Sequence, residues 1–464
     1  MLPLGVIANV KEIVMDRMAW QFSVVWLLWA GLLAPAFARD LVTFDGAAGA
    51  EQLTVFPKSK LEFWQPKDAI SEKGPVPAGR ALRLSGATGS GFLTKSKALG
   101  EVDWRKSGTL AFWVHRSAEE AKEHPTVSLD VRLIEEDHKA HFWRKLEVSH
   151  SGWKKIEMPL DWFRWSNSRI PRWDKVRSLA FLLRDTATVT IYTVWAESTE
   201  TARGDFPSGE LVAEVAFPMN DGATRPRSLE TRDVQLLTNA KSLDLEQLAG
   251  HLASVAKEIR REMPFLPELD RGPVLVIFQT GDEYRQFVPR YALKLNSEAE
   301  QPKSAGFTVE GVSTSSWDDQ FGTLRPVYTH EFVHGWLCRT LRLASDGDWL
   351  HEGLASRFQL KLHPQPKFNE FILASLKNPK AHDQLRDLCD GHRIASNRYW
   401  QAATLCQMLM NDERYQAGLP ILLERLRDSK SSDLGPHLDA VWQTDFYKLT
   451  LDWRAFCERE FGMP

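Results

Sequence analysis

The sequence predicts a multidomain protein in which an N-terminal all-β sandwich precedes an α+β domain with a helical C-terminal part. The chain has 464 residues, which is too long for one ordinary hydrophobic core. Short apolar segments, partly alternating with polar residues, fill residues 41–198, as in β-sandwiches. From residue 232 onward, apolar residues recur at helical spacing between strand-like segments.

Residues 1–38 have the features of a signal peptide. A mostly apolar run from Ala19 to Ala34 follows Arg17 and leads into Pro35-Ala36-Phe37-Ala38, which has small residues where a signal peptidase cuts. We expect cleavage after Ala38 and a secreted or periplasmic protein; an uncleaved N-terminal anchor is the alternative. No later apolar run reaches the length of about 20 residues that spans a membrane, so no stable membrane span is expected after cleavage.

Residues 41–198 contain strand candidates separated by turns. Gly108–Val114, Thr126–Val131, Trp153–Met158 and Thr188–Tyr192 are rich in apolar and β-branched residues. Nine of the 18 Trp fall in this stretch. Because Trp buries a large apolar area, we expect most of these rings to fill the core between two sheets. The alternative is that some of them stack on the faces of sugars.

A change of pattern follows this sandwich. Residues 201–227 are rich in Gly, Pro and charge and predict a linker or an irregular crossover. Residues 232–464 form the second predicted domain. Its expected elements are, in order, a strand at 234–238, a helix at 243–263, a strand at 273–278, a helix at 282–291, an extended segment at 304–316 and mainly helices from residue 324.

The motif with the most specific chemistry is His330-Glu331-Phe332-Val333-His334. Residues four apart lie on one face of a helix, so His330 and His334 can direct their imidazoles at one zinc ion. Glu331 points about 100° away around the helix and can take the proton of a zinc-bound water, as the general base of a metalloprotease does. A chance motif on a structural helix is the alternative.

A third metal ligand is expected further along the chain, because a catalytic zinc ion usually has three protein ligands and one open position. The string Trp349-Leu350-His351-Glu352-Gly353-Leu354-Ala355 begins a second predicted helix, capped by Asp348. Small residues at 353 and 355 would let this helix approach the first one closely.

Residues 232–410 resemble the gluzincin zinc metallopeptidases, and the W-L-x-E-G-L-A string is similar to that of aminopeptidase N-like enzymes and their peptidase MA-like relatives. The resemblance implies that Glu352 is the third ligand of a single zinc ion. His351 is the nearest competing ligand, but one residue of helix turns it about 100° from Glu352. A surface histidine or one that supports the ligands is the favoured interpretation of His351.

The sequence also departs from these families. Thermolysin-type enzymes carry Asp four residues after the glutamate ligand, where this chain has Ser356. Aminopeptidase N-like enzymes carry Asn before that ligand, where this chain has His351. Their upstream Gly-x-Met-Glu-Asn segment, which grips the substrate amino terminus, is replaced here by Ala305-Gly306-Phe307-Thr308-Val309. An endopeptidase acting on a peptide or protein is therefore expected rather than an aminopeptidase.

In gluzincins a Tyr or His downstream of the ligands stabilises the oxyanion, which makes Tyr399 the best candidate by chain order. A tyrosine packed at a surface where a helix begins is the alternative. Tyr328 is a weaker candidate because it precedes the ligand helix.

Residues 41–198 resemble the jelly-roll carbohydrate-binding modules, through the Gly-Trp segment that runs into a strand at 152–160 and the late strand at 188–195. The resemblance implies a glycan partner for this domain. A formal net charge of −3 argues against a nucleic-acid partner, which would need a basic face.

Three functions remain open. The leading hypothesis is a secreted zinc endopeptidase; the alternatives are a catalytically inactive zinc-containing protein that binds a glycan or a surface, and a zinc hydrolase of a non-peptide bond. Retention of Glu331, which a binding protein would not need, favours an enzyme.

Four cysteines lie in the C-terminal third of the chain, at positions 338, 389, 406 and 457. An exported protein could join them in two disulfides. Buried free thiols are the alternative.

Overall fold

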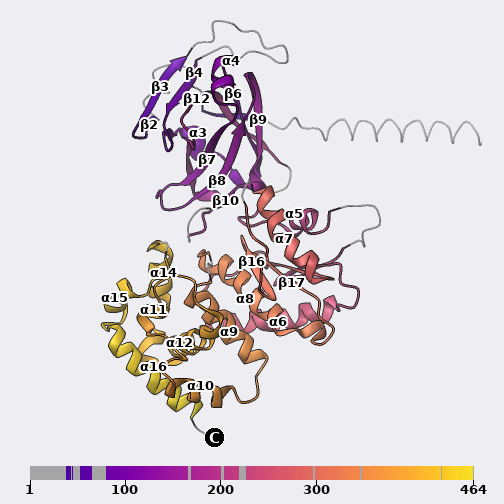
Figure 1. The fold of residues 1–464 in the computed structure, drawn as a ribbon, viewed down its shortest axis with the longest axis vertical. Coiled ribbons are helices and arrows are strands. Elements are labelled where there is room, and N and C mark those ends of the chain that lie inside the picture. Colours follow the sequence, from indigo (N-terminus) through magenta and orange to yellow (C-terminus); the bar gives the residue numbers. More distant parts are fainter. Residues whose placement is uncertain are drawn as a thin grey trace, which may run out of the picture.

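The computed structural model describes residues 38–42, 44, 53–64, 80–165, 169–199, 203–218, 226–295, 298–344, 347–429 and 431–462. The predicted signal peptide lies outside the described residues except for Ala38, where the first strand begins. No helix in these ranges is both long and apolar enough to cross a membrane. Figure 1 shows an N-terminal body of strands at the top of the molecule and a mixed body below it.

The N-terminal body is a sandwich of two antiparallel sheets, as predicted. The first sheet has the order β3-β4-β12-β6-β9, with β1 also pairing with β12; the second has the order β10-β8-β7-β11-β5-β2. The strands are β1 (Ala38–Val42), β2 (Leu53–Val55), β3 (Ser59–Trp64), β4 (Ala81–Gly86), β5 (Gly91–Thr94), β6 (Ser107–Arg116), β7 (Val127–Glu135), β8 (His141–Val148), β9 (Gly152–Pro159), β10 (Arg164–Trp165), β11 (Val176–Leu183) and β12 (Ala187–Ser198).

Alternating residues place the core of the sandwich between its sheets. On β6, Phe112 and Val114 are fully buried, whereas Trp113 and His115 point to the opposite face and are partly exposed. Each strand candidate taken from the sequence falls within one of these strands, except that Thr126 precedes the start of β7 at Val127. The expectation that most of the nine Trp fill the core is wrong. Trp104, Trp165 and Trp173 are buried, and the other six are partly exposed.

The second body contains a five-stranded sheet with the order β13-β14-β15-β17-β16. The three inner strands run parallel, and the two edge strands run antiparallel to them. Helices α6 and α8 pack on one face of the sheet, and α5 and α7 pack on the other. The elements are β13 (Arg227–Glu230), β14 (Gln235–Thr238), β15 (Val274–Phe278), β16 (Gly306–Val309), β17 (Val312–Ser316), α5 (Gly209–Ala216), α6 (Leu245–Glu262), α7 (Gly281–Lys294) and α8 (Pro326–Leu341).

The expected linker, residues 201–227, contains secondary structure. Helix α5 begins after Ser208, whose hydroxyl caps it by accepting from the backbone N–H of Leu211. Val212 and Val215 are buried in a cluster that includes Phe287 on α7. This part of the segment therefore belongs to the second body.

The C-terminal part is helical, as predicted. Helix α12 packs along α9, where a Cβ at Gly353 would lie 2.7 Å from the carbonyl oxygen of Ala402. The helices are α9 (Trp349–Leu362), α10 (Phe368–Lys377), α11 (Leu385–Leu388), α12 (Tyr399–Asn411), α13 (Glu413–Gln416), α14 (Leu419–Ser429), α15 (Leu438–Trp442) and α16 (Phe446–Phe461).

The cysteines are buried free thiols, so the disulfide alternative does not hold. Cys389, Cys406 and Cys457 belong to the main core of the second body, and Cys338 packs with Trp165 and Ile170 of the sandwich.

The C-terminal end of α8 docks on the sandwich. Arg342 ends this helix in the left-handed conformation, donates to the carbonyl oxygen of Pro171 at 2.7 Å and pairs with Asp205 at 3.1 Å. Its own carbonyl oxygen accepts from the backbone N–H of Ile170. One turn earlier, the guanidinium of Arg339 lies 4.5 Å from the ring centroid of Phe206.

Candidate metal centre

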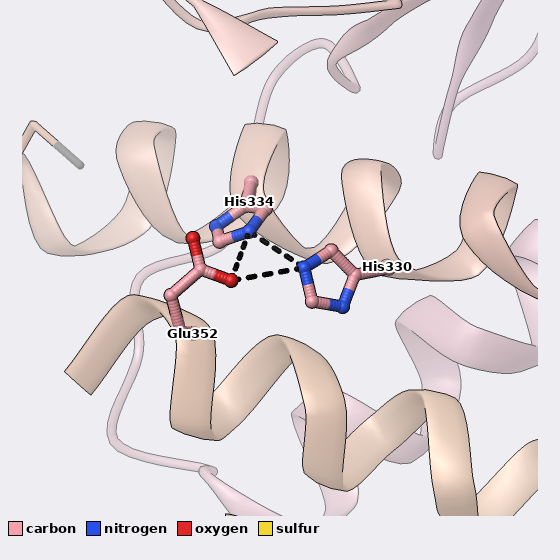
Figure 2. Close-up of side chains that lie close together, drawn as sticks. All are labelled: His330, His334 and Glu352. Atoms are coloured by element: carbon pink, nitrogen blue, oxygen red, sulfur yellow. Dashed lines mark hydrogen bonds and ion pairs between the residues drawn. The ribbon is translucent and has the colours of Figure 1, made fainter. Parts of the chain in front are cut away.

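Three side chains converge between two packed helices. His330 and His334 extend from α8, and Glu352 extends from the first turn of α9 (Figure 2). Oε2 of Glu352 lies 3.1 Å from Nε2 of His330 and 3.5 Å from Nε2 of His334, and the two Nε2 atoms are 3.0 Å apart.

These separations suit a single metal ion. Ligand atoms about 2.0–2.1 Å from a tetrahedral zinc ion stand about 3.3 Å from one another. Two imidazole nitrogens and a carboxylate oxygen are also the donor set of one class of catalytic zinc site. The structure thus brings together the three ligands predicted from the sequence, and their chemistry fits zinc.

Helix α8 can approach the sheet closely because of Gly335. A Cβ at this position would lie 2.8 Å from both Pro273 and the hydroxyl of Ser313. The same hydroxyl donates to the carbonyl oxygen of Glu331 at 2.6 Å. The backbone of the motif is therefore fixed against β17, which sets the direction of both histidines.

Helix α9 is held by its N-terminal cap. A carboxylate oxygen of Asp348 accepts from the backbone N–H groups of Leu350 and His351 at 3.0 and 3.3 Å, as predicted for an N-cap. Glu352 lies in the first turn, where the helix dipole favours negative charge. The absence of a side chain at Gly353 lets α12 support this turn from behind.

The electrostatics of the cluster favour a bound cation. Burial raises the pKa of Glu352, but the imidazoles of His334 and His330 outweigh it and hold the pKa well below its ordinary value. Burial lowers the pKa of His330, yet the carboxylates of Glu352 and Glu331 raise it above its ordinary value. A buried carboxylate needs a positive partner, which a proton or a metal ion in this cluster supplies.

Glu331 lies apart from the three ligands. Its Oε2 accepts a 2.8 Å hydrogen bond from the hydroxyl of Thr308 on β16. A Cβ at Gly306 would lie 2.6 Å from the Glu331 carboxylate, so only glycine leaves room there. Burial raises the pKa of Glu331, which suits a group that must accept a proton.

His351 is excluded as a competing ligand. Its ring is fully buried, with Nδ1 3.0 Å from a carboxylate oxygen of Asp348 and Nε2 3.1 Å from the carbonyl oxygen of Leu343. Both nitrogens therefore face hydrogen-bond acceptors. The histidine supports the start of α9, in keeping with the interpretation favoured from the sequence.

Tyr399 reaches the centre and Tyr328 does not. The ring of Tyr399 stacks on His330 with centroids 6.0 Å apart, and burial together with the nearby carboxylate of Glu352 raises its pKa. Tyr328 is fully buried and donates to the carbonyl oxygen of Ser316 at 3.0 Å. Among the two candidates, Tyr399 is the one placed beside the ligands.

A cleft of about 870 Å³ opens over the centre. Residues 304–308 form one side, and Phe368, Phe371 and Trp400 contribute an apolar side. Thr308 and Arg393 also line it. Sequence reasoning missed both, although the extended segment at 304–316 pointed to the neighbourhood of the first.

Solved structures similar to part of this chain include several carbohydrate-binding modules. A family 11 module from Clostridium thermocellum is 13% identical, with 36% of this chain and 98% of that chain covered and a TM-score of 0.27. A family 22 module of Clostridium thermocellum Xyn10B is 12% identical, with coverage of 36% and 98% and a TM-score of 0.24. The CBM22-1 xylan-binding domain of Paenibacillus barcinonensis Xyn10C is 13% identical, with coverage of 36% and 96% and a TM-score of 0.22. No protein-family model matches the chain, and no curated protein is significantly similar to it.

Proposed function

We propose that this protein is an exported zinc-dependent endopeptidase, with zinc held by His330, His334 and Glu352. The observation that carries the proposal is that one cleft holds three converging metal-binding donors and, beside them, a separate carboxylate that could act as a base. Three donors lie within 3.5 Å of one another, while the carboxylate of Glu331 is held beside them by Thr308. Export rests on the signal-peptide features of residues 1–38.

The residues of the cleft have distinct tasks in this reaction. Bound zinc supplies a Lewis acid that lowers the pKa of water. Glu331 accepts a proton from the attacking water and returns it to the departing amine. The hydroxyl of Tyr399 donates to the carbonyl oxygen as negative charge develops on it. Thr308 orients the carboxylate of Glu331 for the proton transfer.

The form of the cleft favours cleavage within a peptide over removal of its first residue. Strand β16 is an edge strand that pairs only with β17 among the described strands, and it borders the cleft. An extended peptide can add to such an edge through its backbone. Within the described lining, Glu331 and Glu352 are the only carboxylates, which leaves no separate acidic group for a free amino terminus.

The other two functions are less well supported. A catalytically inactive zinc-containing protein that binds a glycan or a surface would gain nothing from a buried carboxylate held next to the ligands but not among them. A non-peptide acyl substrate would use the same water chemistry, but it would not need a strand edge along the cleft.

The metal and the chemistry can be tested separately. Glu331→Gln should retain one zinc per chain while peptide hydrolysis falls by roughly several orders of magnitude, because the ligands remain and the base is lost. His334→Ala should lose the metal as well. Full peptidase activity in Glu331→Gln would overturn the proposal.

A second function, glycan binding by the sandwich, is favoured by an aromatic cluster on the outer face of the first sheet. His115 and Trp153 are cross-strand neighbours with ring centroids 5.0 Å apart, and Trp64 lies 5.1 Å from His115. All three are partly exposed. Partly exposed aromatic rings of this kind offer apolar faces to sugars.

Trp153→Ala should weaken retention of the full-length protein on a polysaccharide panel without changing peptide hydrolysis. Trp195→Ala is the matched control, since this ring belongs to the same sheet but is covered by the ammonium group of Lys155. Equal retention of both variants and the wild type would refute the assignment of the cluster.

A further inference from the structure

The charges in the cleft divide into two groups. Of the two carboxylates that the structure describes there, Glu352 belongs to the cluster with His330 and His334, and Glu331 is held beside that cluster by Thr308. The other charged residues of the described lining are Lys367 and Arg393, and both are cations. A substrate that extends beyond the metal therefore meets positive charge.

Arg393 is fixed by the loop that holds it. The backbone N–H of Ile394 donates to the carbonyl oxygen of Gly347 at 2.9 Å, which ties this loop to the residue before the cap of α9. Gly347 has φ +79°, and a Cβ there would lie 3.3 Å from Cγ and from Nε of Arg393. The arginine side chain therefore lies across a glycine, and its position is set by the same segment that positions Glu352.

The guanidinium of Arg393 is available to a ligand. The residue is exposed and lines the cleft. Within the described parts of the chain its side chain forms no hydrogen bond or ion pair. Tyr399 lines the same cleft. The guanidinium and the hydroxyl proposed to face the scissile carbonyl therefore border the same substrate space.

We propose that Arg393 is a specificity-determining residue that binds a carboxylate of the peptide next to the scissile bond. This inference rests on the proposed peptidase function and names its substrate class. A guanidinium presents a planar pair of N–H donors that matches a carboxylate, which a lysine ammonium does not. Lys367 is exposed at the N-terminus of α10. It adds positive charge to the cleft but lacks the planar pair of donors.

Two chemical sources can supply the carboxylate. One is an Asp or Glu side chain near the cleaved bond, and the other is the free carboxyl terminus of a short peptide. Phe371, which is 50% exposed and lines the same cleft, provides an apolar surface for a neighbouring side chain. The substrate class is thus a peptide that combines an apolar residue with a carboxylate.

The experiment uses the full-length zinc-loaded protein and matched peptides in three forms. One carries Glu near the cleaved bond, one carries Gln at the same position with a free carboxyl terminus, and one carries Gln with an amidated terminus. In the wild type, kcat/KM should be highest for the Glu peptide if Arg393 binds an acidic side chain. It should be highest for the Gln peptide with a free carboxyl terminus if Arg393 binds the terminus. Arg393→Gln should lower that value about tenfold, mainly through KM, as expected for an exposed charged hydrogen bond. The neutral amidated peptide should be unaffected.

Arg425→Gln is the matched control, because Arg425 is an exposed arginine on α14 that does not line the cleft. Equal kcat/KM for all three peptides in the wild type and in Arg393→Gln would overturn the inference while leaving the peptidase function intact. If no peptide is cleaved, the same three peptides are tested for binding to zinc-loaded Glu331→Gln and to Glu331→Gln/Arg393→Gln. Equal affinities of the three peptides for each of these two proteins would also overturn the inference.

Discussion

The hydroxyl of Thr308 on β16 donates a 2.8 Å hydrogen bond to Oε2 of Glu331 on α8. This contact fixes one carboxylate oxygen of the proposed base and leaves the other for water. Thr308→Val keeps the shape of the side chain but removes the donor, so kcat/KM for a peptide should fall about tenfold at unchanged zinc content. Thr308→Ser should remain near the wild type, and a similar loss in the serine variant would point to packing instead.

The stacking of Tyr399 on His330 leads to a second prediction. Tyr399→Phe keeps the ring and its packing but removes the hydroxyl that would donate to the oxyanion. Loss of such a donor costs about 10²-fold or more in kcat with little change in KM. Zinc content and melting temperature should stay at their wild-type values. A normal kcat would show that the tyrosine only supports the histidine ring.

Gly353 can be compared with a second glycine in a helix. A Cβ at Gly353 would meet the carbonyl oxygen of Ala402 and Sγ of Cys406 at 2.7 Å, so Gly353→Ala should destabilise the fold by about 1–3 kcal/mol. Because α9 must shift, zinc affinity should fall too. Gly250, inside α6, has nothing within 4 Å of its added Cβ, and Gly250→Ala should stabilise by about 0.5–1 kcal/mol. Calorimetry would measure the stability of both variants, and metal analysis would measure their zinc content. Equal stability of the two variants would contradict the prediction.

The pairing of the two histidines in the candidate metal centre could be predicted because its geometry is local. His330 and His334 are four residues apart on one helix, and that spacing alone places both rings on one face. The assignment of Glu352 was predicted from a resemblance rather than from geometry. In the structure its carboxylate lies beside both imidazoles. Thr308 and Arg393 could not be found in this way, because only the packed fold brings β16 and the loop after α11 to α8.

Burial was harder to predict than secondary structure. Alternation along β6 predicted a strand correctly, but it did not say that Trp113 would point away from the core. Helix α5 was missed because its eight residues are too few to show a clear helical period, and Gly and Pro nearby suggested a linker. Such a short helix is stabilised by its contacts with α7 rather than by its own sequence.

Stability at low pH should depend on Asp452 on α16. Burial raises the pKa of this carboxyl, but Lys448, Tyr415 and Arg414 hold it below its ordinary value, and the hydroxyl of Tyr415 donates to it at 2.8 Å. A carboxyl whose pKa is lower in the folded chain stabilises the fold above its unfolded pKa of about 3.9, and this stabilisation disappears as the pH falls through the folded pKa.

Asp452→Asn should therefore lower the free energy of unfolding by about 1–2 kcal/mol at pH 7, a modest value because the two cationic partners are half exposed. Denaturant titrations should show the difference from the wild type shrinking below about pH 4. The exposed Asp387 on α11 provides a control, since Asp387→Asn should change stability by less than about 0.5 kcal/mol at either pH. A deficit in Asp452→Asn that persisted undiminished in acid would contradict the ionic explanation.

The docking of α8 on the sandwich would couple the proposed binding of zinc to the unfolding of the sandwich. The helix that carries His330 and His334 ends at Arg342, which is bonded to Pro171 and Asp205, so a sandwich that unfolds releases one end of the ligand helix. Zinc bound as proposed, at 100 times its dissociation constant, would add about 2.7 kcal/mol to the free energy of unfolding of every part that unfolds together with the site. Through the contacts of Arg342, which lies more than one helical turn from the proposed ligands, this stabilisation would extend to the sandwich. The two bodies should consequently melt in a single transition when zinc is bound. When a chelator removes the zinc, two separate melting transitions should appear.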